Sequence, residues 1–260
     1  MSFLEICIIL VAGLWAGAIN TIVGSGTLVT FPVLVSMGVP PVTATISNAM
    51  GLIAGNFTGA WGYRKELKGL ETTLWKLVPC SLVGGILGAY LLLHLPASVF
   101  ESISPVLIGI ALLFVIFQPK LQAVVRKRRE GKSITPADGD HQPPILYALV
   151  FFAGVYGGYF VAAQGVLLLG ILGVFLLASL QGANAIKTVL VAAVNLIAGI
   201  SYVLFAFDRI DWWVVLLIAI SSTIGSWVGA KIGRRMKPAV LRTIIVILGL
   251  AAIVKMVFLD

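Results

Sequence analysis

The sequence predicts an all-α polytopic membrane protein made of two inverted repeats, each of about five helical segments. Two observations of composition and pattern carry the first part of this prediction. Hydrophobic residues make up 60% of the 260-residue chain and charged residues only 11%, whereas soluble domains carry about 25% charged residues. The apolar stretches lack the period-2 alternation of barrel strands, and most reach the ~20 residues of a membrane-spanning helix.

Ten apolar segments are expected to be helical, at 3–22, 27–38, 41–62, 72–93, 97–118, 144–162, 165–178, 183–206, 212–230 and 239–259. The first carries Glu5 and no positively charged start, so we interpret it as a helix and not as a cleaved signal peptide. One long polar, proline-containing stretch interrupts the series and predicts a linker. The expected organisation is an N-terminal transmembrane repeat (1–118), a linker (119–143) and a C-terminal transmembrane repeat (144–260).

The net charge of +8 resides mainly in short loops, which indicates a role in topology and argues against nucleic acid as a partner. The basic loops are 63–69, 120–132 and 231–238, and those without a cationic excess are 93–98 and 207–211. The positive-inside rule places the first set, with the linker, in the cytoplasm and the second set outside. Each half of the chain then crosses the membrane an odd number of times, and both termini lie outside. Five crossings, or a re-entrant hairpin followed by three crossings, satisfy this parity equally.

The third observation is an internal repeat at an offset of 141 residues. Five glycine pairs coincide at that offset: Gly13 with Gly154, Gly17 with Gly158, Gly24 with Gly165, Gly84 with Gly225 and Gly88 with Gly229. Apolar residues match by chance, but five glycine pairs at one offset indicate duplication. The basic loop 63–69 corresponds to the external loop 207–211, so the second copy is predicted to be inverted.

Segments 27–38 and 165–178 are too short to span the membrane comfortably. They have about 12 and 14 residues, or roughly 18 to 21 Å, against a ~30 Å hydrocarbon core. The sequences GSG and AAQG precede them, which predicts short broken or re-entrant helices that begin near the midplane. Free N–H groups at such helix starts predict an anion site, at Gly24, Ser25, Gly26, Thr27, Gln164 and Gly165. The alternative for the glycines is close helix packing.

Lys187 is the only charged residue well within an apolar segment. A lysine there costs roughly 2.5 to 3.5 kcal/mol on insertion scales, so we expect it to face a cavity and bind substrate. The alternative is that it snorkels to the membrane surface. Asn195 lies two helical turns further on, and Asn48 occupies the other half. Both are candidate substrate ligands, with bridging between helices as the alternative.

Other chemistries find little support in the sequence. Cys7 and Cys80 are far apart, and neither His94 nor His141 has a nucleophile or carboxylate arranged around it. No phosphate-binding GxxxxGK[ST] loop occurs. We therefore expect no enzyme activity, no cofactor and no metal site.

Several stretches together resemble the TauE/SafE sulfite exporter family of prokaryotic membrane permeases. They are GLWAGAINTIVGSGTLVTFPVL, ATISNAMGLIAGNFTGAWGYRKEL, GVYGGYFVAAQGVLLLGILG and ANAIKTVLVAAVN. The resemblance covers nearly the whole chain outside 119–143. Residues that fall in the recurring segments are Gly24, Gly26, Ser47, Asn48, Gln164, Gly165, Lys187 and Asn195. Two departures are the reduced glycine cluster GSGT and Val161, where a small residue is common.

The resemblance implies a secondary transporter for a small sulfur-containing or organic anion of the sulfite or sulfonate class. Alternating access between the two halves is the expected mechanism and export the expected direction, with a passive anion channel as the alternative. The expected partners are the small anion and the lipid bilayer of a prokaryotic cell membrane. The sequence does not decide whether a proton or sodium ion is coupled to transport, or whether the protein forms a homodimer.

Overall fold

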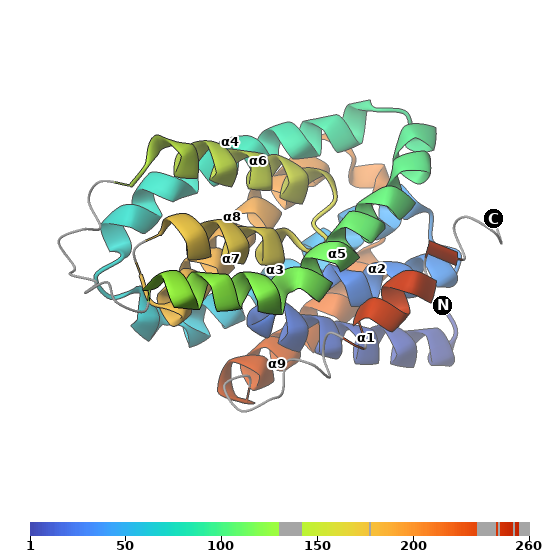
Figure 1. The fold of residues 1–260 in the computed structure, drawn as a ribbon. Helices are drawn as coiled ribbons and strands as arrows, with labels where there is room; N and C mark the ends of the chain where they lie inside the picture. Colours follow the sequence, from blue (N-terminus) through green and yellow to red (C-terminus); the bar gives the residue numbers. More distant parts are fainter. Residues whose placement is uncertain (130–141, 177, 233–242, 244, 252, 255–260) are drawn as a thin grey trace.

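The computed structural model describes residues 1–129, 142–176, 178–232, 243, 245–251 and 253–254. Within these ranges every regular element is a helix (Figure 1), which confirms the predicted all-α class. Part of the predicted linker (130–141), most of the third basic loop (233–238) and parts of the last segment lie outside the described residues.

The α-helices are α1 (Phe3–Ile22), α2 (Thr27–Ser36), α3 (Pro41–Gly62), α4 (Glu71–His94), α5 (Ala97–Arg129), α6 (Pro144–Tyr159), α7 (Gln164–Phe175), α8 (Leu180–Phe205) and α9 (Trp212–Ile232). The described loops contain the 3-10 turns η1 (Arg64–Leu67) and η3 (Phe207–Arg209). The described residues from 243 to 254 are also helical.

Within the described residues, five helices are long and apolar enough to cross a membrane, at Phe3–Ile22, Glu71–His94, Ala97–Phe117, Gln181–Phe205 and Trp212–Lys231. Each has at least 20 residues, which gives a length of about 30 Å or more. Large apolar side chains on them are exposed, among them Leu204 at 68% and Trp213 at 69%. Such a surface suits a lipid environment, because a soluble protein rarely exposes so much apolar area.

Local sequence explains where several helices begin and end. Ser2 and Glu5 form a reciprocal capping box at the start of α1. Pro41 and Pro144 occupy the first position of α3 and α6, where a missing N–H costs nothing. α5 continues past the predicted linker start at 119, because residues 120–129 contain neither glycine nor proline and continue an established helix.

α2 and α7 are short, as the sequence predicts, with 10 and 12 residues. At 1.5 Å per residue they are about 15 and 18 Å long. α2 packs on α1 and α3, and α7 packs on α6 and α8. The two short helices therefore take equivalent places in the two halves.

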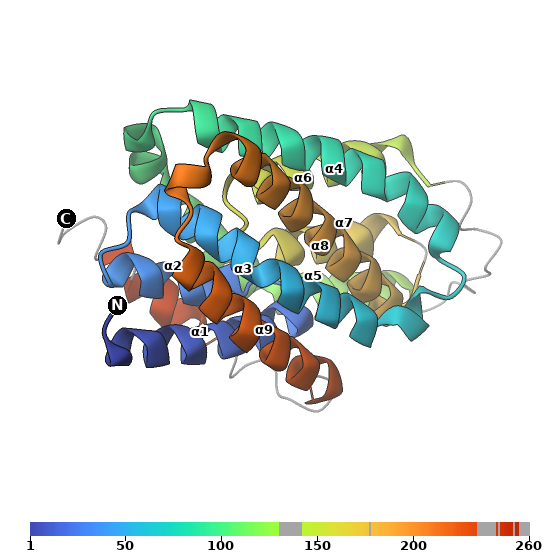
Figure 2. The same cartoon turned by 180° about the vertical axis from the view of Figure 1, so that it is seen from behind.

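Two close helix crossings form opposite edges of the structure. Figures 1 and 2 show α4 and α6 along one edge, α1 and α9 along the other, and α7 and α8 between them. Glycines from four of the five predicted pairs line these crossings. A Cβ at Gly225 would lie 1.9 Å from the carbonyl oxygen of Leu14 in α1, and one at Gly88 would lie 2.1 Å from that of Val155 in α6.

These crossings are equivalent under the predicted repeat, because α1 corresponds to α6 and α4 to α9. The close approach of backbones through glycine is the packing expected between membrane helices. The contacts support the duplication, and the inverted orientation of the two halves stays a prediction.

Candidate functional site

The two breaks that precede α2 and α7 touch each other inside the protein. A Cβ added at Gly24 would lie 2.6 Å from the carbonyl carbon of Gly165, and one added at Gly165 would lie 2.6 Å from the Gly24 Cα. Gly24 also has a φ of 91°, a conformation that glycine adopts without steric penalty. The fifth glycine pair of the repeat thus brings the N-terminal ends of two short helices close together.

Neither short helix has a side-chain cap at its N-terminus. The N-cap residues are Gly26 for α2 and Ala163 for α7, and among the described residues neither offers a side-chain acceptor to the first turn. Several first-turn N–H groups already donate to the backbone of the breaks, such as Leu28 to Ser25 and Val166 to Ala163. Each helix N-terminus still carries a partial positive charge. Two such ends near one another form an electropositive place for an anion.

The backbone of the second break is strained. Val161 has a φ of 61° and Ala163 a φ of 58°, in the left-handed region that a β-branched residue strongly disfavours. Strained backbone persists only where the surrounding structure holds it, and it gathers at ligand sites.

Lys187 reaches the C-terminal end of α1 from α8. Its Nζ donates to the carbonyl oxygens of Asn20 at 3.2 Å and Thr21 at 3.5 Å. Its side chain is only 1% exposed, so it does not snorkel to a surface. The carbonyl end of a helix carries a partial negative charge, which stabilises a cation there. Lys187 therefore lies beside the first break, within the protein interior.

Asn20, which the sequence analysis did not select, links several of these groups. Its Nδ2 donates to the Asn56 Oδ1 at 2.5 Å, and its Oδ1 accepts from the Gly26 N–H at 3.4 Å. Together with its carbonyl contact to Lys187, this makes Asn20 the residue that holds the first break in place. A polar side chain in the last turn of an apolar helix, directly ahead of a glycine break, is a signal that could have identified it.

Asn48 bridges helices, the alternative weighed for it from sequence. Its Oδ1 accepts from the Thr30 hydroxyl, and its Nδ2 donates to the Thr27 Oγ1 at 3.1 Å. Ser47 is likewise engaged, since its Oγ accepts from the Asp211 N–H at 2.9 Å. Asn48 and Thr27 therefore fix α2 against α3.

Three predicted site residues carry buried polar atoms that, among the described residues, have no hydrogen-bond partner: Ser25, Gln164 and Asn195. Ser25 is 1% exposed, and Gln164 and Asn195 are fully buried. Ser25 follows Gly24 and Gln164 precedes Gly165, so both lie within one residue of the contact between the breaks. An unsatisfied buried polar group costs about 1 to 3 kcal/mol, and a bound ligand would remove that cost.

Helix geometry places Asn195 toward the same region. Tyr202 lies seven residues further along α8 and therefore on the same face. The Tyr202 hydroxyl donates to the carbonyl oxygen of Gly158 at 2.9 Å, just before the second break. The neighbouring Gly157 leaves room for Gln164, because a Cβ there would lie 2.1 Å from the Gln164 Cδ. Asn195 thus lies on the α8 face that packs against α6, about 10 Å along the helix from Tyr202.

We call the residues Gly24, Ser25, Gln164, Gly165, Lys187 and Asn195 the central cluster. Among the nine predicted residues, the structure brings Gly24, Ser25, Gln164 and Gly165 to the junction of the breaks and Lys187 beside the first break. We include Asn195 because its polar atoms are buried and without a partner among the described residues. Gly26 lies at the start of α2 in the first break, and Thr27 and Asn48 support α2. Asn184, whose buried Oδ1 has no partner among the described residues, was not predicted. Its position eleven residues before Asn195 puts it near the same face of α8.

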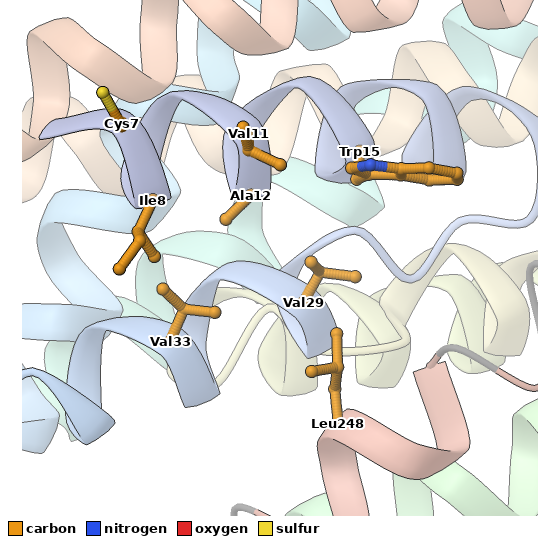
Figure 3. A pocket seen from close by; sticks show the side chains of 8 residues that line it. All are labelled: Cys7, Ile8, Val11, Ala12, Trp15, Val29, Val33 and Leu248. Atoms are coloured by element: carbon orange, nitrogen blue, oxygen red, sulfur yellow. The ribbon is translucent and has the colours of Figure 1, made fainter. Parts of the chain in front are cut away.

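An apolar hollow lies elsewhere and has a different character. It has a volume of about 520 Å³ and is lined by Cys7, Ile8, Val11, Ala12, Trp15, Val29, Val33 and Leu248. Figure 3 shows Ile8 and Ala12 of α1 facing Val29 and Val33 of α2, with Leu248 beside them, the Trp15 ring at one end and Cys7 directed away from α2. None of the described lining residues is charged, so they offer an anion no counter-charge. The described residues contain no cluster of metal-ligating side chains.

Comparisons with known proteins agree with the resemblance seen in the sequence. The family model described as Sulfite exporter TauE/SafE matches residues 9–256, which confirms that resemblance over nearly the whole chain. No solved structure matches this chain.

Several similar proteins are named as probable transporters. A probable membrane transporter protein of Haemophilus influenzae is 26% identical over 256 residues, covering 97% of this chain and 94% of that protein. The probable membrane transporter protein ORF9 of a Sinorhizobium species is 25% identical over 260 residues, covering 98% and 94%. The probable membrane transporter protein YfcA of Escherichia coli K12 is 27% identical over 157 residues, covering 58% and 52%.

Proposed function

Because the chain belongs to the Sulfite exporter TauE/SafE family of membrane transporters, we propose that it is a secondary transporter for a small sulfur-containing or organic anion. The substrate is of the sulfite or sulfonate class, and the protein moves it by alternating access. The observation that supports this best is the central cluster. It combines a buried lysine, polar side chains that have no hydrogen-bond partner among the described residues, and two helix N-termini that no described side chain caps. Anions bind at such helix ends.

Each part of the cluster has a distinct role in anion binding. Lys187 neutralises the charge of the anion, and the N-terminal ends of α2 and α7 supply N–H donors. Ser25, Gln164 and Asn195 orient the substrate through their unpartnered polar atoms. Asn48 acts indirectly, because it fixes α2 against α3.

The contact of Lys187 with α1 connects binding to movement. α1 belongs to the first half and α8 to the second, and the Lys187 Nζ joins them through two carbonyl oxygens. A bound anion competes with those oxygens for the Nζ. Anion binding therefore weakens one contact between the halves, as a carrier that rocks one half against the other requires.

The membrane potential can supply the energy for export. Outward movement of one negative charge across an inside-negative membrane releases about 2.3 kcal/mol per 100 mV. We place the protein in the cell membrane of a prokaryote, with the basic loop 63–69 and the linker in the cytoplasm and both termini outside.

Counterflow in proteoliposomes tests the carrier proposal. Vesicles loaded with unlabelled sulfite should take up labelled sulfite transiently against its gradient, with a rate that saturates as concentration rises. A carrier gives this exchange because its site faces one side at a time. Sulfite flux that neither saturates nor shows counterflow would favour the passive channel. Absence of flux for sulfite and for small sulfonates, with folded protein, would contradict the substrate class.

A further inference from the structure

The central cluster offers hydrogen-bond acceptors as well as donors. The unpartnered atoms include the carboxamide oxygens of Gln164 and Asn195 alongside their amide nitrogens. Both atoms of each carboxamide lack a partner among the described residues, so the choice of which atom is oxygen does not affect the count. A ligand that satisfies this cluster must accept hydrogen bonds and also donate them.

We propose that the transported anion is a monoanion that carries a hydrogen-bond donor of its own. Hydrogensulfite, which is sulfite with one proton, and sulfonates that bear a hydroxyl group belong to this class, and the sulfate dianion does not. The proposal rests on the proposed function and narrows the substrate of that same site.

The acceptor atoms carry the first part of the argument. A fully deprotonated oxyanion has only acceptors, so it would leave the Gln164 Oε1 and Asn195 Oδ1 unpaired and place negative oxygens near them. A donor-bearing anion pairs with these oxygens while its charged group faces Lys187 and the helix ends. Binding sites built to hydrogen-bond a hydroxyl group reject analogues that lack it, because the protein's own polar group is then left unpaired.

The charge of the buried site carries the second part of the argument for a monoanion. Lys187 is the one charged residue among the buried residues that the structure describes, and its Nζ already donates to two backbone carbonyl oxygens. One cation balances one negative charge. A second negative charge would be buried without a counter-ion, which is strongly unfavourable in a membrane interior.

The test compares two sulfonates of equal charge as inhibitors of labelled sulfite counterflow. Hydroxyethanesulfonate carries a hydroxyl donor, and ethanesulfonate does not. We expect the hydroxyl compound to inhibit at a concentration lower by about 10-fold or more, because ethanesulfonate leaves a buried acceptor unpaired. Sulfate should inhibit more weakly than either. Equal inhibition by the two sulfonates, in vesicles with normal sulfite counterflow, would overturn the proposal and leave the carrier intact.

Variants test whether the Gln164 and Asn195 carboxamides cause the preference for the hydroxyl compound. Gln164→Met and Asn195→Leu each replace a carboxamide side chain by an apolar one of similar volume. Each variant should reduce the preference for the hydroxyl compound. Gln181→Met makes the same change as the first variant at an exposed position of α8, and should keep the native preference. A preference that survives in both Gln164→Met and Asn195→Leu would overturn the assignment. Absence of sulfite counterflow in the folded native protein would instead contradict the proposed function.

Discussion

Replacing Lys187 with methionine should lower saturable anion counterflow by about 10- to 100-fold. Hydrogen bonds to a charged group contribute about 1.5 to 3 kcal/mol, which corresponds to this range. Methionine keeps much of the side-chain length, so the change removes the charge with little loss of packing. The same step leaves the Asn20 and Thr21 carbonyl oxygens without their lysine donor. Initial rates of labelled sulfite counterflow in proteoliposomes measure the effect.

Two further variants separate charge from folding in this test. Lys187→Arg retains the cation and should keep more activity than Lys187→Met. Lys65→Met makes the same substitution at an exposed position of η1 and should leave counterflow unchanged. Native counterflow in a well-folded Lys187→Met protein would show that the lysine serves only to hold α1.

Gly24→Ala should destabilise the protein far more than Gly38→Ala. Both glycines have a positive φ, of 91° and 85°, so each alanine costs about 1 to 2 kcal/mol in backbone conformation. Only at Gly24 does the added Cβ meet another backbone, that of Gly165, whereas nothing lies within 4 Å at Gly38. Overpacking adds about 1 to 3 kcal/mol. Thermal unfolding in detergent should therefore show a clearly lower midpoint for Gly24→Ala.

A second pair of glycine variants tests the same contact between Gly24 and Gly165 at positions where φ is not positive. Gly165→Ala places a Cβ 2.6 Å from Gly24, whereas Gly109→Ala in α5 meets nothing within 4 Å. Alanine favours a helix over glycine by up to about 1 kcal/mol. Gly109→Ala should consequently match or exceed native stability while Gly165→Ala falls below it. Equal midpoints for the two variants would mean that the breaks do not touch.

The short helices and the glycine pairs of the repeat could be predicted because they depend on local features. Segment length, glycine position and the 141-residue offset are all present in the sequence. The residues that surround the site depend on contacts between distant segments. Nothing in the sequence shows that the Lys187 Nζ reaches the Asn20 carbonyl oxygen, or that Gly24 lies against Gly165.

Asn48 and Asn195 illustrate the same limit for side-chain roles. Both are asparagines within apolar helices, and sequence assigns them the same two possible roles. Asn48 finds Thr27 and Thr30 as neighbours and bridges two helices, whereas Asn195 keeps both polar atoms without a partner among the described residues. The neighbours on other helices decide between bridging and ligand binding.

Alternating access to the central cluster is tested most directly by the reactivity of a single cysteine at Ser25. Cys7→Ala and Cys80→Ala remove the two native thiols, and Ser25→Cys introduces one beside Gly24. A membrane-impermeant thiol reagent is applied to membrane vesicles of each orientation, with and without sulfite. The cysteine should react from both sides, and saturating sulfite should slow both reactions. Reaction from one side only, or rates that sulfite leaves unchanged, would contradict a site that faces each side in turn.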